Sequence, residues 1–260
     1  MKCNAKCTLL TFILLAINVS VGNNAGYANE WQADHYDKNA INWSATSISF
    51  LRGRGYLVGE KKRTIATFDH SSGGKIGSHY FFFDVINPDS DFISIYGEWH
   101  PAFSLSNLFN QTDSIWKIDD ILLVGEYDYG SNPVSSFRRY YYGIGVRIDF
   151  ESADYFNVNF LYGGDPSVPG DTEQISVSWG FPFTLFRVHG IFSGYVDYVG
   201  SESYFVANIQ SQPQLLVDIG RVMDFKNKVY FGIEYQYWRN KFGLQGITEK
   251  VPQLILSLSL

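Results

Sequence analysis

Apolar and polar residues alternate with a period of two along most of the chain. In residues 229–238, Val229, Phe231 and Ile233 occupy every second position, with Gly232 and Glu234 between them. This alternation puts the two kinds of side chain on opposite faces of an extended strand. It recurs between clusters of Gly, Pro, Asn, Asp and Ser, and predicts about twelve strands, roughly at residues 43–52, 62–70, 77–87, 90–104, 118–130, 137–150, 154–163, 172–182, 187–199, 204–221, 227–240 and 250–260.

The length of these segments indicates which face is buried. The pattern suits either a soluble barrel or sandwich with an apolar interior, or a membrane barrel with an apolar exterior and a polar lumen. Many segments are about 10 to 14 residues long, which fits a tilted membrane crossing of about 9 to 11 residues better than the usual strand of about 5 or 6. We therefore predict an all-β fold, a transmembrane antiparallel β-barrel of about 12 strands with up-and-down topology.

The start of the chain has the features of a signal peptide. Lys2 and Lys6 precede an apolar run that extends over residues 8–21, and small residues stand before the expected cleavage site. The run is too short for a transmembrane helix, which needs about 20 residues. Residues 1–28 are therefore predicted to be a signal peptide and 29–260 a transmembrane barrel domain in the bacterial outer membrane.

Composition and charge narrow the classes of function. Residues 1–28 contain two of the 20 basic residues and none of the 26 acidic ones, so the mature chain has a net charge of about −8. This charge argues against a nucleic-acid partner. Cys3 and Cys7 both lie before the apolar run, so the mature chain has no disulfide, and stabilisation must come from elsewhere. The aromatic content of 17% is typical of strands with one lipid-facing side.

The polar positions of the strands supply candidate lumen-lining side chains. If the apolar faces contact lipid, the opposite faces line a lumen. The residues predicted to contact solute there are Phe82, Asp84, Tyr96, Glu98, Glu126, Tyr141, Arg147, Asp149, Asp218, Glu234 and Trp238. The same parity is shared by Phe92, His100, Asp128, Tyr155, Tyr195 and Asp197. The alternative is that these residues only fill and hydrate a narrow barrel, pairing acid with base across strands.

Neither a metal centre nor a catalytic site is expected. The five histidines lack the spacing of metal ligands, and no cofactor motif is present. An outer-membrane lipase would need a serine and a histidine together on the lipid-facing side. His100 and His189 have the inward parity, and His79 has the outward parity without an evident serine partner. We therefore predict that the protein is not an enzyme.

Several segments, taken in their order along the chain, resemble the Tsx-like nucleoside-specific channel family of outer-membrane proteins. They are Tyr96-Gly97-Glu98-Trp99-His100-Pro101 with Ser104-Leu105-Ser106, Pro213-Gln214-Leu215 with Asp218-Ile219-Gly220, the stretch 190–200, and Val229-Tyr230-Phe231-Gly232-Ile233-Glu234-Tyr235-Gln236-Tyr237-Trp238. The resemblance covers nearly all of the predicted mature chain. It implies a twelve-stranded barrel and nucleoside uptake.

The expected function is passive transport of nucleosides or similar small polar solutes. A nucleoside has a flat base that stacks on aromatic rings and a ribose that forms hydrogen bonds. The alternative is a structural or surface-recognition barrel without solute specificity, which could serve as a phage or toxin receptor. Since one chain can close its own barrel, the protein is expected to be a monomer in contact with outer-membrane lipid.

Overall fold

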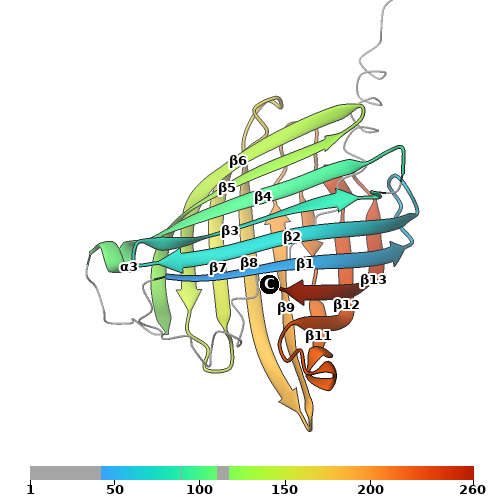
Figure 1. Ribbon diagram of the computed structural model, residues 1–260. Helices are drawn as coiled ribbons and strands as arrows, with labels where there is room; N and C mark the ends of the chain where they lie inside the picture. Colours follow the sequence, from blue (N-terminus) through green and yellow to red (C-terminus); the bar gives the residue numbers. More distant parts are fainter. Residues whose placement is uncertain (1–41, 89, 110–116) are drawn as a thin grey trace, which may run out of the picture.

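The computed structural model describes residues 42–88, 90–109 and 117–260, which form one antiparallel sheet (Figure 1). The predicted signal peptide lies outside the described residues. The strands are β1 (Asn42–Arg54), β2 (Lys62–Gly74), β3 (Gly77–Ile86), β4 (Ser94–Ser104), β5 (Ile118–Asn132), β6 (Ser135–Ile148), β7 (Tyr155–Gly164), β8 (Thr172–Leu185), β9 (Val188–Val199), β10 (Asn208–Ser211), β11 (Gln214–Asp218), β12 (Val229–Arg239) and β13 (Thr248–Ser259).

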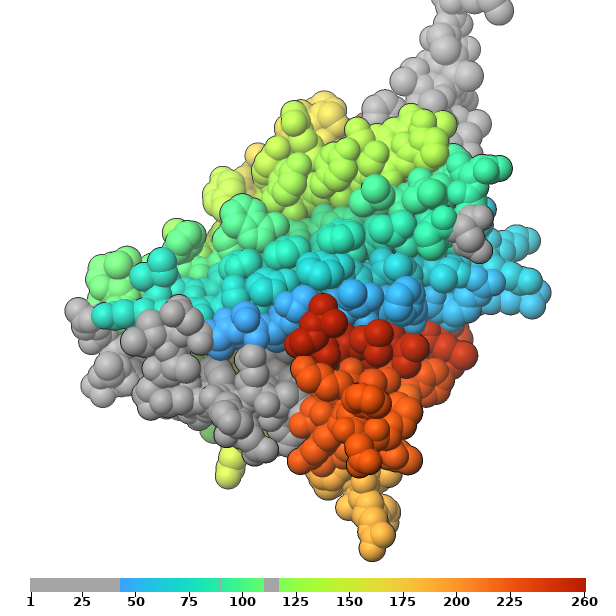
Figure 2. Space-filling model, in the orientation of Figure 1, coloured from blue at the N-terminus to red at the C-terminus, as the bar shows by residue number. Residues whose placement is uncertain are grey.

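Pairing of the first strand with the last closes the sheet into a barrel. Leu51 of β1 lies opposite Ile65 of β2 on one side and Ile255 of β13 on the other. Figure 2 shows β1 lying against β13 in a continuous wall. Closure gives every described strand a neighbour on both sides, which lowers the cost of exposing backbone polar groups to lipid.

The described residues provide twelve strand positions around the barrel. The short strands β10 and β11 share one position, because both lie between β9 and β12. The interruption falls at Gln212 and Pro213, and proline has no backbone N–H to donate to a neighbouring strand. The prediction of an antiparallel barrel of about twelve strands is confirmed, with the predicted strand 204–221 divided in two.

The connections alternate between the two ends of the barrel. Residues 55–61, which we call the first loop, lie at one end with residues 165–171, 200–207 and 240–247. The opposite end, here the terminal end, carries the C-terminus and the helices α3 (Leu105–Leu108) and η2 (Gly220–Met223). A further helix, η3 (Lys241–Gly243), lies at the first-loop end. None of the helices among the described residues has the length and apolarity required to cross a membrane.

The two faces of the wall have opposite character. Ile144, Phe231 and Leu256 point outward and remain 44%, 44% and 37% exposed, whereas Asp84 and Glu234 are fully buried inside. In water this arrangement would expose apolar side chains and bury charges, so it is stable only where lipid surrounds the barrel. The chain is therefore a transmembrane β-barrel with the inside-out arrangement of the outer-membrane class.

The interior is not uniformly polar. A cluster of buried apolar side chains lies inside the wall formed by β1–β3, β9 and β11–β13, and comprises Leu51, Ile65, Ile86, Ile191, Leu216, Tyr230 and Ile255. These residues succeed one another across paired strands, as Ile86, Ile65 and Leu51 show. The sequence pattern predicted a polar lumen, and the cluster shows that part of the lumen is packed like a protein core.

Candidate functional site

A cavity opens inside the barrel toward the first-loop end. Its empty volume, part of which is open to solvent, is about 700 Å³. The residues that line it come from β4–β6, β8–β10, β12 and the loops beside them, and are Tyr96, Glu98, Glu126, Asp128, Phe137, Arg139, Tyr141, Gln174, Asp197, Val199, Gly200, Glu202, Phe205, Asn208, Gln210, Trp238, Phe242 and Gly243.

Three buried carboxylates meet on one wall of this cavity. Glu98 of β4 is the cross-strand partner of Asp128 of β5, and Glu126 follows on the same face of β5. Their side chains converge because residues two apart on a strand share a face and paired residues lie side by side. Oxygens from the three groups lie within 4.8 Å of one another. This spacing would also suit a divalent cation, although neighbouring protein groups compete for the same oxygens.

Neutral donors and one histidine surround two of these carboxylates. The Tyr96 hydroxyl donates to Glu98 Oε1 at 2.5 Å, and His100 Nε2 lies 2.7 Å from Glu98 Oε2. Gln174 Nε2 donates to both oxygens of Glu126, at 3.0 and 2.9 Å. His100 Nδ1 lies 3.6 Å from Glu126, so a protonated His100 bridges the two acids. These contacts fix the carboxylates in place.

Two further acids and one arginine complete the charges of the cavity. Asp197 and Glu202 bring the carboxylates on its lining to five, whereas Arg139 is the one arginine or lysine among the described lining residues. Glu202 accepts a hydrogen bond from the backbone N–H of Asp165 at 3.1 Å, and burial raises the pKa of Glu202 above its usual range. The cavity therefore has a strong excess of acceptors and of potential negative charge.

Aromatic rings form the other part of the lining. The Arg139 guanidinium carbon lies 5.1 Å from the centre of the Phe137 ring. At the barrel mouth, Lys241 Nζ lies 4.7 Å from the Trp238 ring and 5.1 Å from the Phe242 ring, and these two rings are 4.5 Å apart. Such distances are typical of cation–π contacts. The rings offer flat apolar faces next to hydrogen-bonding groups, and further rings come from Tyr96, Tyr141 and Phe205.

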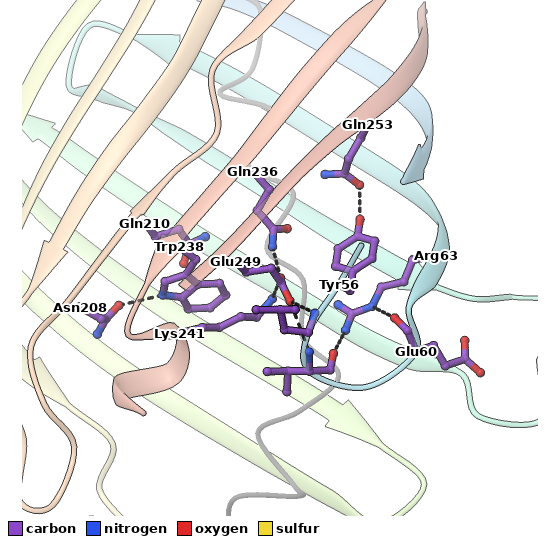
Figure 3. Close-up of polar contacts among 12 residues, drawn as sticks. Tyr56, Glu60, Arg63, Asn208, Gln210, Gln236, Trp238, Lys241, Glu249 and Gln253 are labelled. Atoms are coloured by element: carbon purple, nitrogen blue, oxygen red, sulfur yellow. Dashed lines mark hydrogen bonds and ion pairs between the residues drawn. The ribbon is translucent and has the colours of Figure 1, made fainter. Parts of the chain in front are cut away.

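The first loop folds into the mouth beside this cavity, as Figure 3 shows around Tyr56 and Arg63. Both side chains are almost completely buried, and the Arg63 guanidinium lies 4.2 Å from the centre of the Tyr56 ring. The Tyr56 hydroxyl donates to Gln253, and Arg63 donates to the backbone oxygen of Val58. The loop therefore occupies part of the lumen and narrows it.

Glu249 of β13 holds the first loop to the strand next to β1 (Figure 3). Its Oε2 accepts from the backbone N–H of Leu57 at 2.7 Å, and its Oε1 accepts from both Lys241 and Gln236. Lys241 and Glu249 form a completely buried ion pair. Burial lowers the pKa of Lys241 to about 7, and the negative charge of Glu249 partly opposes the shift. We call these contacts of Glu249 the latch.

Nine of the residues predicted to contact solute point inward and are buried, namely Phe82, Asp84, Tyr96, Glu98, Glu126, Tyr141, Asp218, Glu234 and Trp238. Those that line the cavity are Tyr96, Glu98, Glu126, Tyr141 and Trp238. Phe82 packs behind them, with its ring centre 5.8 Å from that of Tyr96. The predicted parity is therefore observed for these residues, while their contact with solute stays a prediction.

Some inward acids are held by protein groups away from the cavity. Asp84 accepts from the hydroxyl of Thr67 at 2.6 Å. Glu234 accepts from Gln214 at 2.6 Å and from Gln253 at 2.7 Å. For these residues the structure agrees with the alternative hypothesis, in which inward polar side chains fill the barrel and form hydrogen bonds with other protein groups.

Three predicted lumen residues lie at the terminal end. Asp218 pairs with Arg221 at 2.8 Å, and Arg147 is half-buried near the end of β6. The prediction that Asp149 lines the lumen is wrong, because Asp149 lies beyond β6 and is exposed. Its backbone N–H donates to the oxygen of Lys117 at 2.8 Å, one residue beyond the last pair of β5 and β6.

The residues missing from the sequence prediction lie mainly in loops. Tyr56, Glu202 and Lys241 enter the lumen from connections that have no alternating pattern, so periodicity could not identify them. Arg139 and Gln174 lie on strands with the inward parity. For these two, the alternation along β6 and β8 carries the signal that they face the lumen.

A serine and a histidine lie together on the outer face of the barrel, contrary to the sequence prediction. Ser72 Oγ lies 2.7 Å from His79 Nε2 on neighbouring strands, so the expectation that His79 has no serine partner is wrong. A nucleophilic serine also needs its histidine oriented by a third group. His79 Nδ1 is buried and has no hydrogen-bond partner among the residues that the structure describes. Within the described residues, the pair therefore lacks the third member of an acyl-transfer site.

Comparison with known proteins gives structural neighbours only. No protein-family model and no curated protein matches the sequence. The solved structures that it resembles include a KdgM porin, with a TM-score of 0.48, 7% identity and coverage of 82% of this chain and 99% of that chain. A KdgM porin in complex with disordered oligogalacturonate gives a TM-score of 0.47 at 7% identity, with the same coverage of 82% and 99%. The translocator domain of autotransporter NalP from Neisseria meningitidis gives 0.40 at 11% identity, covering 88% and 92% of the two chains. At these scores the likeness says nothing about a solute.

Proposed function

We propose that this protein is a passive channel for small polar solutes in the bacterial outer membrane, and that nucleosides are among the solutes it passes. The observation that supports the proposal is the cavity inside the barrel, with carboxylate oxygens on one wall and aromatic rings on another. A membrane barrel with a polar interior cavity suits the movement of solutes between two aqueous compartments.

The chemistry of a nucleoside matches both walls. Its hydroxyl and amino groups can donate hydrogen bonds, and the carboxylate oxygens of Glu98, Glu126 and Asp128 can accept them. Its base is flat and stacks on rings such as that of Trp238, whose Nε1 already donates to Asn208 Oδ1 at 3.0 Å. Several weak contacts rather than one tight site favour release on the other side.

Solutes with negative charge are expected to pass poorly. The five carboxylates of the lining face a single guanidinium, Arg139, in a cavity walled by protein. A cleft with charge of one sign concentrates counter-ions and repels ions of the same sign. Nucleosides should therefore pass faster than the corresponding nucleotides.

A liposome-swelling assay tests the proposal directly. Proteoliposomes should swell faster in adenosine than in an uncharged sugar of similar size, after subtraction of the rate in liposomes without protein. Trp238→Ala should reduce this preference, because it removes a ring from the cavity wall. The matched control is Trp99→Ala, since Trp99 lies on the outer face and is 49% exposed.

The outcomes separate channel function from nucleoside preference. Equal rates for adenosine and the sugar would leave a general channel without nucleoside selectivity. No swelling with either solute would overturn the channel itself and favour a structural or surface-recognition barrel, for which the loops rather than the lumen would bind a phage or toxin.

A further inference from the structure

Acidic side chains outnumber basic ones around the cavity. Glu98, Glu126, Asp128, Asp197 and Glu202 line one continuous space, and Arg139 is the one cationic side chain among its described lining residues. His100 adds at most one positive charge, through its contacts with two of the acids. Because buried charge is costly without compensation, the cavity favours a positively charged occupant.

One acceptor of the cluster is left without a donor. Asp128 is only 4% exposed, and its side chain is hydrogen-bonded to Glu126, but its Oδ1 has no hydrogen-bond partner within the described part of the chain. Its neighbours Glu98 and Glu126 accept hydrogen bonds from Tyr96 and from Gln174. Buried polar atoms of native proteins nearly always have a partner, so an unpaired oxygen on a cavity wall indicates a place for a donor from outside the chain.

The aromatic part of the lining already accommodates cations of the protein itself. Lys241 places its ammonium over the rings of Trp238 and Phe242, and Arg139 places its guanidinium over Phe137. All three rings line the cavity. The rings therefore present faces at which a positive charge is stabilised, in the same cavity as the five carboxyl groups.

From these observations we infer that the cavity is a binding site for organic cations, meaning solutes with an ammonium or guanidinium group on a flat or hydroxylated body, and that the channel is cation-selective. The inference rests on the proposed channel function and does not depend on the choice of nucleosides. In the bound state, the cationic group donates to Asp128 and its neighbouring carboxylates while the flat part of the solute packs on the aromatic wall.

Ion selectivity in planar bilayers gives the first test. Under a gradient of potassium chloride, the reversal potential should show that K⁺ passes in preference to Cl⁻ by about tenfold, as expected where a cleft carries charge of one sign. Asp128→Asn and Glu126→Gln should each lower this ratio. Asp119→Asn is the matched control, because Asp119 is exposed at the terminal end, and it should leave the ratio unchanged.

Two results of this experiment would overturn the inference. One is a K⁺ to Cl⁻ ratio near one in the unmodified protein. The other is an equal loss of selectivity in Asp119→Asn and Asp128→Asn. A shift in electrophoretic mobility on heating, measured for every variant, confirms that each compared barrel is folded.

A second test uses three solutes that share a base and a ribose. 5′-Amino-5′-deoxyadenosine is an ammonium ion at neutral pH, adenosine is uncharged, and adenosine-5′-carboxylic acid is an anion. The inference predicts uptake rates that fall in that order, with the order flattened in Asp128→Asn. Equal rates for the three solutes would contradict cation binding and leave nucleoside passage intact. A preserved order, with adenosine no faster than a sugar, would sink nucleoside preference and leave cation binding intact.

Discussion

Glu249→Gln is the substitution whose effect on the barrel mouth can be worked out most fully. Glutamine keeps an oxygen that can accept from Leu57, but it places an amide N–H₂ where Oε1 now accepts from Lys241 and Gln236. Hydrogen bonds to charged groups contribute about 1.5 to 3 kcal/mol each. Removing one partner of a buried ion pair costs about 3 to 5 kcal/mol, because the other charge is left uncompensated. Both estimates give a decrease of several kcal/mol in the free energy of unfolding.

Two measurements on Glu249→Gln test this reasoning, the free energy of unfolding and the single-channel conductance. Urea unfolding in lipid vesicles below pH 7, where Lys241 carries its charge, should show the free energy of unfolding of Glu249→Gln reduced by about 3 to 5 kcal/mol when followed by tryptophan fluorescence. Single-channel conductance should rise, because the first loop loses its attachment to β13. Glu173→Gln is the control, since Glu173 is exposed near the same end, and its effect should stay within about 0.5 kcal/mol.

A double-mutant cycle isolates the ion pair. Adding Lys241→Met to Glu249→Gln removes the unpaired ammonium, so the double variant should be more stable than Glu249→Gln alone. If the two substitutions add without coupling, or if Glu249→Gln unfolds and conducts like the unmodified protein, the latch does not hold the mouth as the structure indicates.

Three further expectations follow from other parts of the barrel. Because the pKa of Lys241 is about 7 in the folded state and 10.5 in its ordinary state, the unfolded chain binds more protons between these values. Stability should therefore rise with pH across that window, by up to about 1.4 kcal/mol per pH unit, in urea titrations of the unmodified protein but not of Lys241→Met. Ile233→Arg introduces a charge on the lipid-facing side and should cost about 2 to 4 kcal/mol in vesicle unfolding, against about 0.5 kcal/mol if that face met water. Ser72 should remain unlabelled by a fluorophosphonate, because His79 lacks an orienting group, and labelling lost in Ser72→Ala would show an active nucleophile instead.

The wall of the barrel was predictable because strand periodicity is a local property. A period of two fixes which side chains share a face, so Phe231 and Glu234 could be assigned to opposite faces without knowledge of their neighbours. The ends of strands depend on partners distant in the sequence. β6 was predicted to reach Phe150, but it ends at Ile148, which is why Asp149 lies outside the lumen.

The candidate site was predictable only in part. Parity brings Glu98 and Glu234 to the same side of the wall, yet Glu98 lines the cavity while Glu234 is bonded to Gln214 and Gln253. The difference arises from the stagger between strands and from the first loop, which fills part of the mouth. Tyr56 and Lys241 lie in connections where no period exists, so three-dimensional packing alone reveals their position.

The central claim is that lipid surrounds the apolar face and that the charged face lines an aqueous interior. Nitroxide labels on single cysteines test it, in a chain with Cys3 and Cys7 replaced by serine and the barrel in vesicles. A label at Ile233→Cys should collide with oxygen dissolved in lipid and be shielded from a water-soluble nickel complex. A label at Arg139→Cys should show the reverse. Nickel access at position 233 together with oxygen access at position 139 would contradict the account.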